Sequence, residues 1–163
     1  MNPEDVPQGP LCVDTDVFRY LHVGKRPHLD EFQQLVRSHV LVLSFATVGE
    51  VRAWSLHHKF GDRRRQELEQ KILDHYVVLT PTDAVVRAYA QLHARFTGRL
   101  SQGGQNDMWT AACALAQPSP LPVVTNNLGD FTTIAEESPS KSYTRHGDSA
   151  THTCCHLLGV LCW

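Results

Sequence analysis

The sequence predicts an α/β fold in which helices cover a parallel β-sheet. Short apolar runs alternate with longer segments of helical periodicity, and this alternation is typical of such folds. The run Val-Leu-Val-Leu at 40–43 is apolar throughout, as expected for a strand that is buried on both faces. The chain has 163 residues, which is enough for a single domain with one core.

Each element is predicted from local signals. Thr47 is expected to cap the helix after the second strand, with Glu50 at capping-box spacing, and this helix should stop near Gly61. Pro81 fits the start of a later helix. The expected strands span residues 11–13, 40–43, 76–79 and 121–124, and the expected helices span 17–22, 29–36, 47–56, 62–75, 80–96 and 106–116. Residues 125–131 have the composition of turns and are expected to form a loop.

Composition indicates a soluble, cytoplasmic protein without a membrane segment. Hydrophobic residues make up 42% of the chain and charged residues 20%, and no apolar run approaches the ~20 residues that span a bilayer. The acidic N-terminus lacks the features of a signal peptide. The net charge of -2 disfavours a DNA-coating role. The basic run formed by Lys59 and 63–65 either offsets a carboxylate cluster or is a solvated helix face.

The cysteines and the C-terminal segment indicate no disulfide or zinc framework. Five cysteines, an odd count without a secretion signal, favour reduced thiols, and Cys12 and Cys113 are expected to be buried. The domain is expected over 1–134, with 135–163 a divergent or poorly ordered tail that lacks a convincing edge strand and has the character of a frameshifted end. Zinc is disfavoured because no Cys-x-x-Cys spacing occurs among His152, Cys154, Cys155, His156 and Cys162.

Acidic and amide side chains follow the predicted strands. Asp14 ends the first strand, and Glu50 lies one turn into the helix after the second. Asp107 begins the helix that leads into the fourth strand, which Asn127 and Asp130 follow. Because ligands bind at the carboxyl ends of parallel strands, we expect these side chains to converge at one edge of the sheet.

Clustered carboxylates are suited to metal-dependent hydrolysis of phosphodiesters. Divalent ions activate water and stabilise charge on phosphoryl oxygens, and Mg²⁺ and Mn²⁺ prefer oxygen ligands. Without an ion the carboxylates would repel one another. Taken singly, Asp14 is also explained as a turn residue, Glu50 as a capping partner of Thr47, and Asp107 as a helix-start residue with Asn106 as the cap.

Four sequence blocks resemble the PIN-domain family. They are Leu-Cys-Val-Asp-Thr-Asp-Val-Phe at 11–18, Leu-Ser-Phe-Ala-Thr-Val-Gly-Glu-Val at 43–51, Asn-Asp-Met-Trp-Thr-Ala-Ala at 106–112 and Val-Val-Thr-Asn-Asn-Leu-Gly-Asp-Phe at 123–131. Their order and spacing are similar to those of VapC-type toxins of toxin–antitoxin modules. The resemblance covers roughly residues 10–134.

This resemblance implies a three-layer α/β/α sandwich with a central parallel sheet of four to five strands. It also implies an endoribonuclease that depends on Mg²⁺ or Mn²⁺, forms a homodimer and is inhibited by a cognate antitoxin. Asp14, Glu50 and Asp107 match the three acidic metal positions, and Asn127, with Asp130 nearby, stands at the fourth position, which is often Asp. The hydroxyl positions of the family, which contact a carboxylate, water or substrate, are matched by Thr15 and Thr125.

Three further points stay open at the level of sequence. Arg99, in the loop before Asp107, is a candidate phosphate contact or a plain solvated arginine. A PIN-like module that binds RNA or protein without catalysis is the main alternative function. A haloacid-dehalogenase-like phosphatase is suggested by Asp14-Thr15-Asp16, but no lysine lies between Lys71 and Lys141, where that class requires one.

Overall fold

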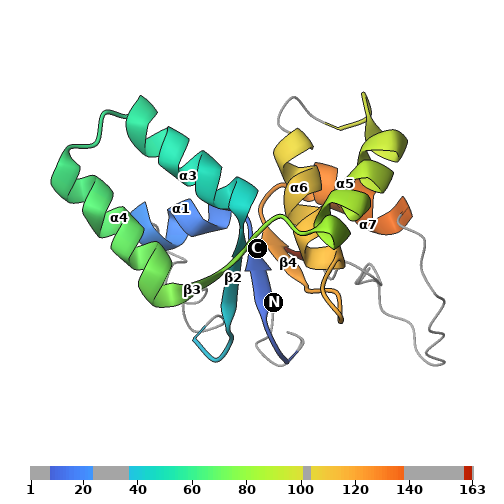
Figure 1. Ribbon diagram of the computed structural model, residues 1–163, viewed down its shortest axis with the longest axis horizontal. Coiled ribbons are helices and arrows are strands. Elements are labelled where there is room, and N and C mark those ends of the chain that lie inside the picture. Colours follow the sequence, from blue (N-terminus) through green and yellow to red (C-terminus); the bar gives the residue numbers. More distant parts are fainter. Residues whose placement is uncertain (1–7, 24–36, 101–103, 138–159, 163) are drawn as a thin grey trace.

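A five-stranded parallel β-sheet forms the centre of the molecule (Figure 1). The structure is a computed structural model, and it describes residues 8–23, 37–100, 104–137 and 160–162. The strand order is β3-β2-β1-β4-β5, and all neighbouring strands are parallel. The strands are β1 (Leu11–Val13), β2 (Leu41–Ser44), β3 (Tyr76–Leu79), β4 (Val123–Thr125) and β5 (Val160–Cys162).

Helices cover both faces of this sheet. In the described residues they are α1 (Thr15–Val23), α3 (Phe45–His57), α4 (Asp62–His75), α5 (Asp83–Phe96), α6 (Gly104–Leu115) and α7 (Leu128–Glu137). Helices α1, α3 and α4 lie on one side, and α5, α6 and α7 lie on the other (Figure 1). The molecule is therefore the three-layer sandwich that the sequence predicts. None of these helices is long and apolar enough to cross a membrane.

Side chains of the central strand alternate between two cores, one on each face of the sheet. Leu11 and Val13 pack with residues of α1, α3 and α4, whereas Cys12 packs with residues of α5, α6 and α7. Cys12 and Cys113 are buried free thiols, as predicted. Because both faces of β1 are buried, the strand holds the residue that follows it, Asp14, in a fixed place.

Ser44, at the end of β2, caps α3, and the prediction that Thr47 is the cap is wrong. The Ser44 hydroxyl accepts a hydrogen bond from the Thr47 backbone N–H at 3.0 Å, and the Ser44 backbone is extended. The same hydroxyl lies 2.9 Å from the hydroxyls of Thr47 and Thr110, and all three side chains are buried. This hydroxyl cluster joins the start of α3 to α6.

Two predictions about the chain after β4 are also wrong. Residues 125–131 were expected to form a loop, but α7 begins at Leu128, because Phe131 and Ile134 are fully buried in the core and this burial outweighs the turn-forming composition. An edge strand is present, since 160–162 pair with β4 in parallel. Three apolar residues are too few to show a strand periodicity, which explains the omission.

Several predictions fall on residues that the structure leaves out. The expected helix at 29–36 and the segment 138–159, including His152, Cys154, Cys155 and His156, lie outside the described residues. The divergent or frameshifted tail and the disfavoured zinc site therefore stay predictions.

The hydroxyl cluster predicts a measurable stability difference. Ser44→Ala removes the cap of α3 and leaves two buried threonine hydroxyls with one partner fewer, so the free energy of unfolding should fall by about 2 kcal/mol or more. Thr82→Ala is the matched control, because Thr82 caps α5 through its hydroxyl on an exposed surface and should cost about 1 kcal/mol. Urea titrations followed by circular dichroism measure both. Equal losses would contradict the stabilising role of the cluster.

Candidate functional site

Asp14 directly follows the central strand and is held from both sides. Its side chain is 5% exposed. One carboxylate oxygen accepts a hydrogen bond from the Thr15 backbone N–H at 2.7 Å, at the start of α1. The other accepts from the Thr125 hydroxyl at 2.7 Å, at the end of β4. Asp14 therefore connects β1, β4 and α1 at the carboxyl edge of the sheet.

Glu50 projects from α3 and is held by two donors from other helices. One carboxylate oxygen accepts from the Thr15 hydroxyl of α1, and the other accepts from the Asn106 side-chain amide of α6 at 2.7 Å. The interpretation of Glu50 as a capping partner of Thr47 is thus wrong. Asn106 is not the cap of α6 either, because α6 begins at Gly104.

Asn127 bridges two further carboxylates. Its side-chain amide donates to Asp107 at 2.7 Å and to Asp130 at 3.1 Å. Its backbone N–H donates to the Thr125 hydroxyl at 2.9 Å, which is the hydroxyl that contacts Asp14. Asp107 and Asp130 are 9% and 6% exposed. These contacts complete a continuous set of hydrogen bonds, the acidic network, formed by Asp14, Thr15, Glu50, Asn106, Asp107, Thr125, Asn127 and Asp130.

Burial raises the pKa of two carboxyl groups of the network, those of Asp14 and Asp107. The pKa of Asp107 is raised to about 8, first because the group is buried and further because Asp14, Asp130 and Glu50 lie nearby. The pKa of Asp14 is raised to about 6 by burial, against the opposing effect of its hydrogen bonds from two threonines. Within the described ranges, no lysine or arginine forms an ion pair with Asp14, Glu50 or Asp107.

Family comparison accounts for this arrangement. The family model described as "PIN domain" matches residues 11–136, a segment that contains the whole acidic network. The chain belongs to the PIN-domain family. The match confirms the PIN domain that the four sequence blocks predict. The alternative of a haloacid-dehalogenase-like phosphatase, which belongs to another family, is set aside. No curated protein shows a significant match to the chain.

Solved structures of toxin–antitoxin systems share the fold of this PIN domain. VapBC2 from Rickettsia felis, bound to a DNA fragment from the promoter, is 16% identical with a TM-score of 0.63, over 77% of this chain and 92% of that chain. VapBC-1 from nontypeable Haemophilus influenzae is 22% identical with a TM-score of 0.62, at the same coverage. VapBC-5 from Mycobacterium tuberculosis is 25% identical with a TM-score of 0.57, over 81% and 94%. The likeness to VapC-type PIN domains is thereby confirmed.

The donor set of the PIN domain suits a hard divalent cation, because carboxylate oxygens dominate it. In the part of the chain that the structure describes, however, no three His, Cys, Asp or Glu side chains lie close enough together to hold one ion. Glu50 is instead bound by Thr15 and Asn106, and Asp107 by Asn127. Neutral donors thus satisfy the oxygens of these carboxylates. Metal binding would require these side chains to exchange hydrogen bonds for coordination.

One further residue of the site region was predicted from the sequence, and another was missed. Arg99 lies in the turn after α5 with its guanidinium 5.5 Å from the centre of the Phe96 ring, and its contact with phosphate stays a prediction. Asn106 was not predicted as a site residue. Its position next to Asp107 in the third sequence block was the only signal that could have identified it.

The raised pKa values predict how one substitution changes stability with pH. In the unfolded chain Asp107 should titrate near 4, so between pH 4 and 8 the folded protein binds more protons and loses stability as pH rises. Asp107→Asn removes this penalty. The Asp107→Asn variant should therefore melt at a higher temperature than the unaltered protein, and the difference should grow from pH 5 to pH 8. Calorimetry in EDTA measures both melting midpoints. Asp74→Asn, on the exposed face of α4, controls for the loss of a negative charge. A gain that stays constant or becomes a loss would contradict the prediction.

Proposed function

We propose that the protein is an endoribonuclease that depends on Mg²⁺ or Mn²⁺ and acts as the toxin of a toxin–antitoxin pair. The observation that carries this proposal is the presence of two buried carboxyl groups with raised pKa values, Asp14 and Asp107, at the carboxyl edge of a PIN-domain sheet. Within the described residues neither has a cationic partner. Burying carboxyl groups whose ionisation is disfavoured in this way costs stability, and a functional site is the usual reason.

The proposed chemistry is hydrolysis of a phosphodiester. When bound, the divalent ion supplies the positive charge that stabilises the phosphoryl oxygens and activates water. Asp14, Glu50 and Asp107 are the proposed metal ligands. Thr15 and Thr125 each direct their hydroxyl proton to a carboxylate, so they act as positioning residues for Glu50 and Asp14.

Asn127 supports a single metal site. Its amide donates to Asp107 and Asp130, so it places a hydrogen-bond donor where a fourth carboxylate would add a ligand. A second ion would depend on Asp130. We therefore assign one metal to the three carboxylates and treat Asn127 as a neutral bridge that lessens repulsion between Asp107 and Asp130.

The proposed partners follow from the neighbouring structures. Those structures are named for VapBC toxin–antitoxin systems, and the Rickettsia felis complex is bound to promoter DNA. For this chain we propose a cognate antitoxin that covers the acidic network, a homodimeric assembly and a location in the cytoplasm. RNA is the proposed substrate.

Cleavage of RNA tests the enzymatic proposal against a non-catalytic binding module. We expect Mg²⁺ or Mn²⁺ to support cleavage of a mixed RNA pool, with EDTA abolishing it, and Asp14→Asn to reduce the rate at least about 100-fold. Asp16→Asn is the matched control, because Asp16 is the next acidic residue along the chain and is exposed. Gel electrophoresis of labelled RNA measures both. If the unaltered protein cleaves RNA no faster than the Asp14→Asn variant does, the enzymatic proposal fails in favour of the non-catalytic binding module.

The bridging role of Asn127 makes a separate prediction. Asn127→Asp places a third carboxylate between Asp107 and Asp130, so the metal-free protein should melt at a lower temperature at pH 8. The same change adds an oxygen ligand, so the rise in melting midpoint on adding Mn²⁺ should be larger than in the unaltered protein. Thermal scans with EDTA and with Mn²⁺ measure both effects. A variant that is equally stable without metal would contradict the role given to Asn127.

A further inference from the structure

Helices α1 and α3 run side by side away from the acidic network. At the start of α1 the Thr15 hydroxyl donates to Glu50 in the second turn of α3. Four residues further along each helix, the Arg19 guanidinium lies 5.0 Å from the centre of the Trp54 ring. Residues four apart share one face of a helix, so the Arg19–Trp54 contact continues the line that begins at Thr15 and Glu50.

The same line continues beyond the end of α3. The Phe60 ring packs edge-to-face on Trp54 with 4.8 Å between centroids, and the Arg64 guanidinium lies 3.6 Å from the centre of the Phe60 ring. The aromatic faces attract the guanidinium groups and restrict their positions. We call the set formed by Arg19, Trp54, Lys59, Phe60 and Arg64 the arginine–aromatic line.

Lys59 occupies a backbone position that normally favours glycine. Helix α3 ends in a Schellman motif, in which the Phe60 N–H donates to Ser55 O at 3.0 Å and the Lys59 N–H donates to Leu56 O at 2.9 Å. Lys59 has a φ of 53°, which is the left-handed conformation of this motif. A residue other than glycine there costs about 1–2 kcal/mol. The Lys59 side chain is exposed, so packing does not explain why lysine is tolerated.

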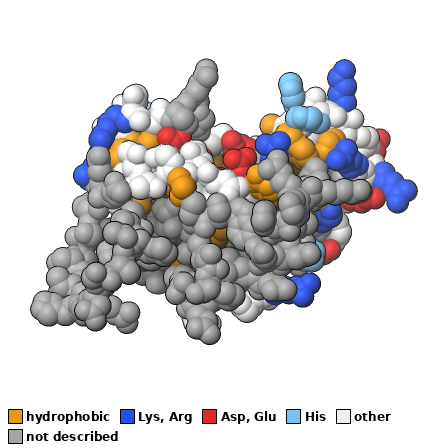
Figure 2. All heavy atoms as spheres, turned by 180° about the vertical axis from the view of Figure 1, so that it is seen from behind, with side chains coloured by type: hydrophobic (Ala, Val, Ile, Leu, Met, Phe, Trp, Pro, Cys, Tyr) orange, Lys and Arg blue, Asp and Glu red, His pale blue; other side chains and the backbone are white. Residues whose placement is uncertain are grey.

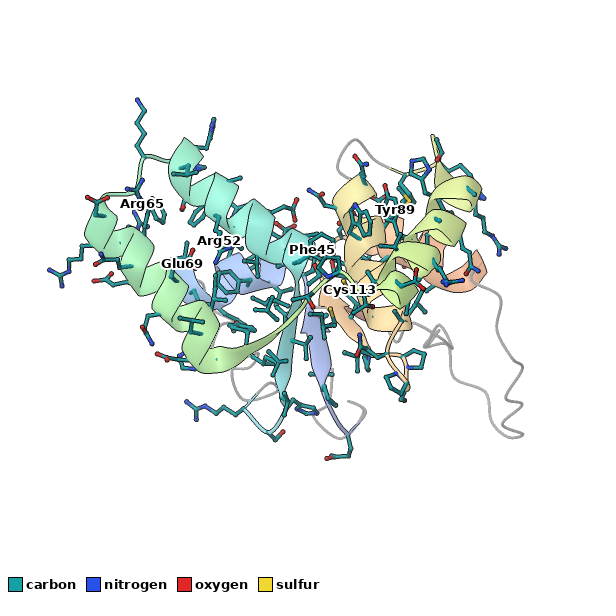
Figure 3. All side chains as sticks on the ribbon, viewed as in Figure 1. Phe45, Arg52, Arg65, Glu69, Tyr89 and Cys113 are labelled. Carbon is teal, nitrogen blue, oxygen red and sulfur yellow. The ribbon has the colours of Figure 1, made fainter. Side chains whose placement is uncertain are left out.

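Among the described residues, the cations of the line lack the close carboxylate partners that the neighbouring arginines have. Among the described residues, Lys59 and Arg64 have no carboxylate partner, and Arg19 has only an exposed contact of 3.8 Å with Asp16, which contributes little. Figure 3 shows Arg52 of α3 facing Glu69 of α4. The neighbouring ion pairs are Arg52 with Glu69, Arg63 with Glu67 and Arg65 with Asp62.

We propose that the arginine–aromatic line binds the phosphate groups of the RNA strand that is cut at the acidic network. This proposal rests on the proposed function. With a helical rise of about 1.5 Å per residue, Lys59 lies about 14 Å along the chain of α3 from Glu50, so the line leads directly away from the cleavage site. Figure 2 shows lysine, arginine and histidine side chains over the α3–α4 end of one face, beside acidic side chains near its middle. Guanidinium groups bind phosphate oxygens in a bidentate geometry.

Binding of RNA without cleavage tests this proposal. The probe is a fluorescein-labelled single-stranded RNA of mixed sequence, titrated with the full chain in EDTA and followed by fluorescence anisotropy. The double variant Lys59→Gly/Arg64→Gln should bind about tenfold more weakly. The slope of log affinity against log salt should fall by about 1.4, since each phosphate contact on a single strand contributes about 0.7.

Two controls separate this effect from misfolding and from a general loss of charge. Lys59→Gly alone should bind RNA more weakly and yet melt at a higher temperature, because glycine suits its φ. Arg63→Gln/Arg65→Gln removes the same charge from paired arginines and should leave the affinity nearly unchanged. Equal weakening by both double variants, or no weakening by Lys59→Gly/Arg64→Gln, would overturn the proposal.

A competition experiment distinguishes RNA from an acidic protein segment. Unlabelled poly(U) should displace the probe from the unaltered protein more effectively than poly-L-glutamate does, when the two polymers are compared at equal concentrations of phosphate and carboxylate groups. If poly-L-glutamate competes equally, the line is a surface for an acidic protein and the proposal fails. Binding is measured in EDTA, so its outcome does not depend on metal-dependent cleavage. A failure of RNA binding can therefore be distinguished from a failure of the proposed function.

Discussion

Repulsion among Asp14, Glu50 and Asp107 is the constraint on which the arrangement of the site depends. One of these residues follows the central strand and the other two lie on helices from opposite faces of the sheet, so the fold brings all three to the same edge of the sheet. Each is held by threonine or asparagine, and none by a cation among the described residues. Neutral donors satisfy the oxygens but leave the charge in place. The neutral donors thus let the site fold, and the proposed divalent ion would supply the positive charge that they lack.

The charge of the molecule is separated along α3. Its first turns carry Glu50 into the acidic network, and the turn after its end carries Lys59 and then Phe60, on whose ring Arg64 packs. The net charge of -2 conceals this separation, because total charge says nothing about local fields. A negative centre with a positive extension is consistent with a site that must hold a cation and a polyanion at the same time.

Most of the fold could be predicted because apolar runs indicate the strands directly, and the bounds of β3 and α4 agree with prediction. The errors arise where local signals compete. Ser44 and Thr47 both suit a cap, and only packing of the hydroxyl cluster decides between them. The contact of Asn106 with Glu50 depends on how α6 is rotated against α3, which no local pattern encodes. The carboxylates of the site, and Thr15, Thr125 and Asn127 with them, were predictable, whereas the donor Asn106 was not.

The hydroxyl cluster of Ser44, Thr47 and Thr110 joins the two faces of the sandwich through hydrogen bonds that have no fixed direction. In each pair either oxygen can donate, so the hydrogens can point around the cluster in either direction without any bond being lost. A contact between a hydroxyl and a carboxylate has no such freedom. The cluster therefore has two equivalent arrangements of its hydroxyl protons, and it joins α3 to α6 in either of them.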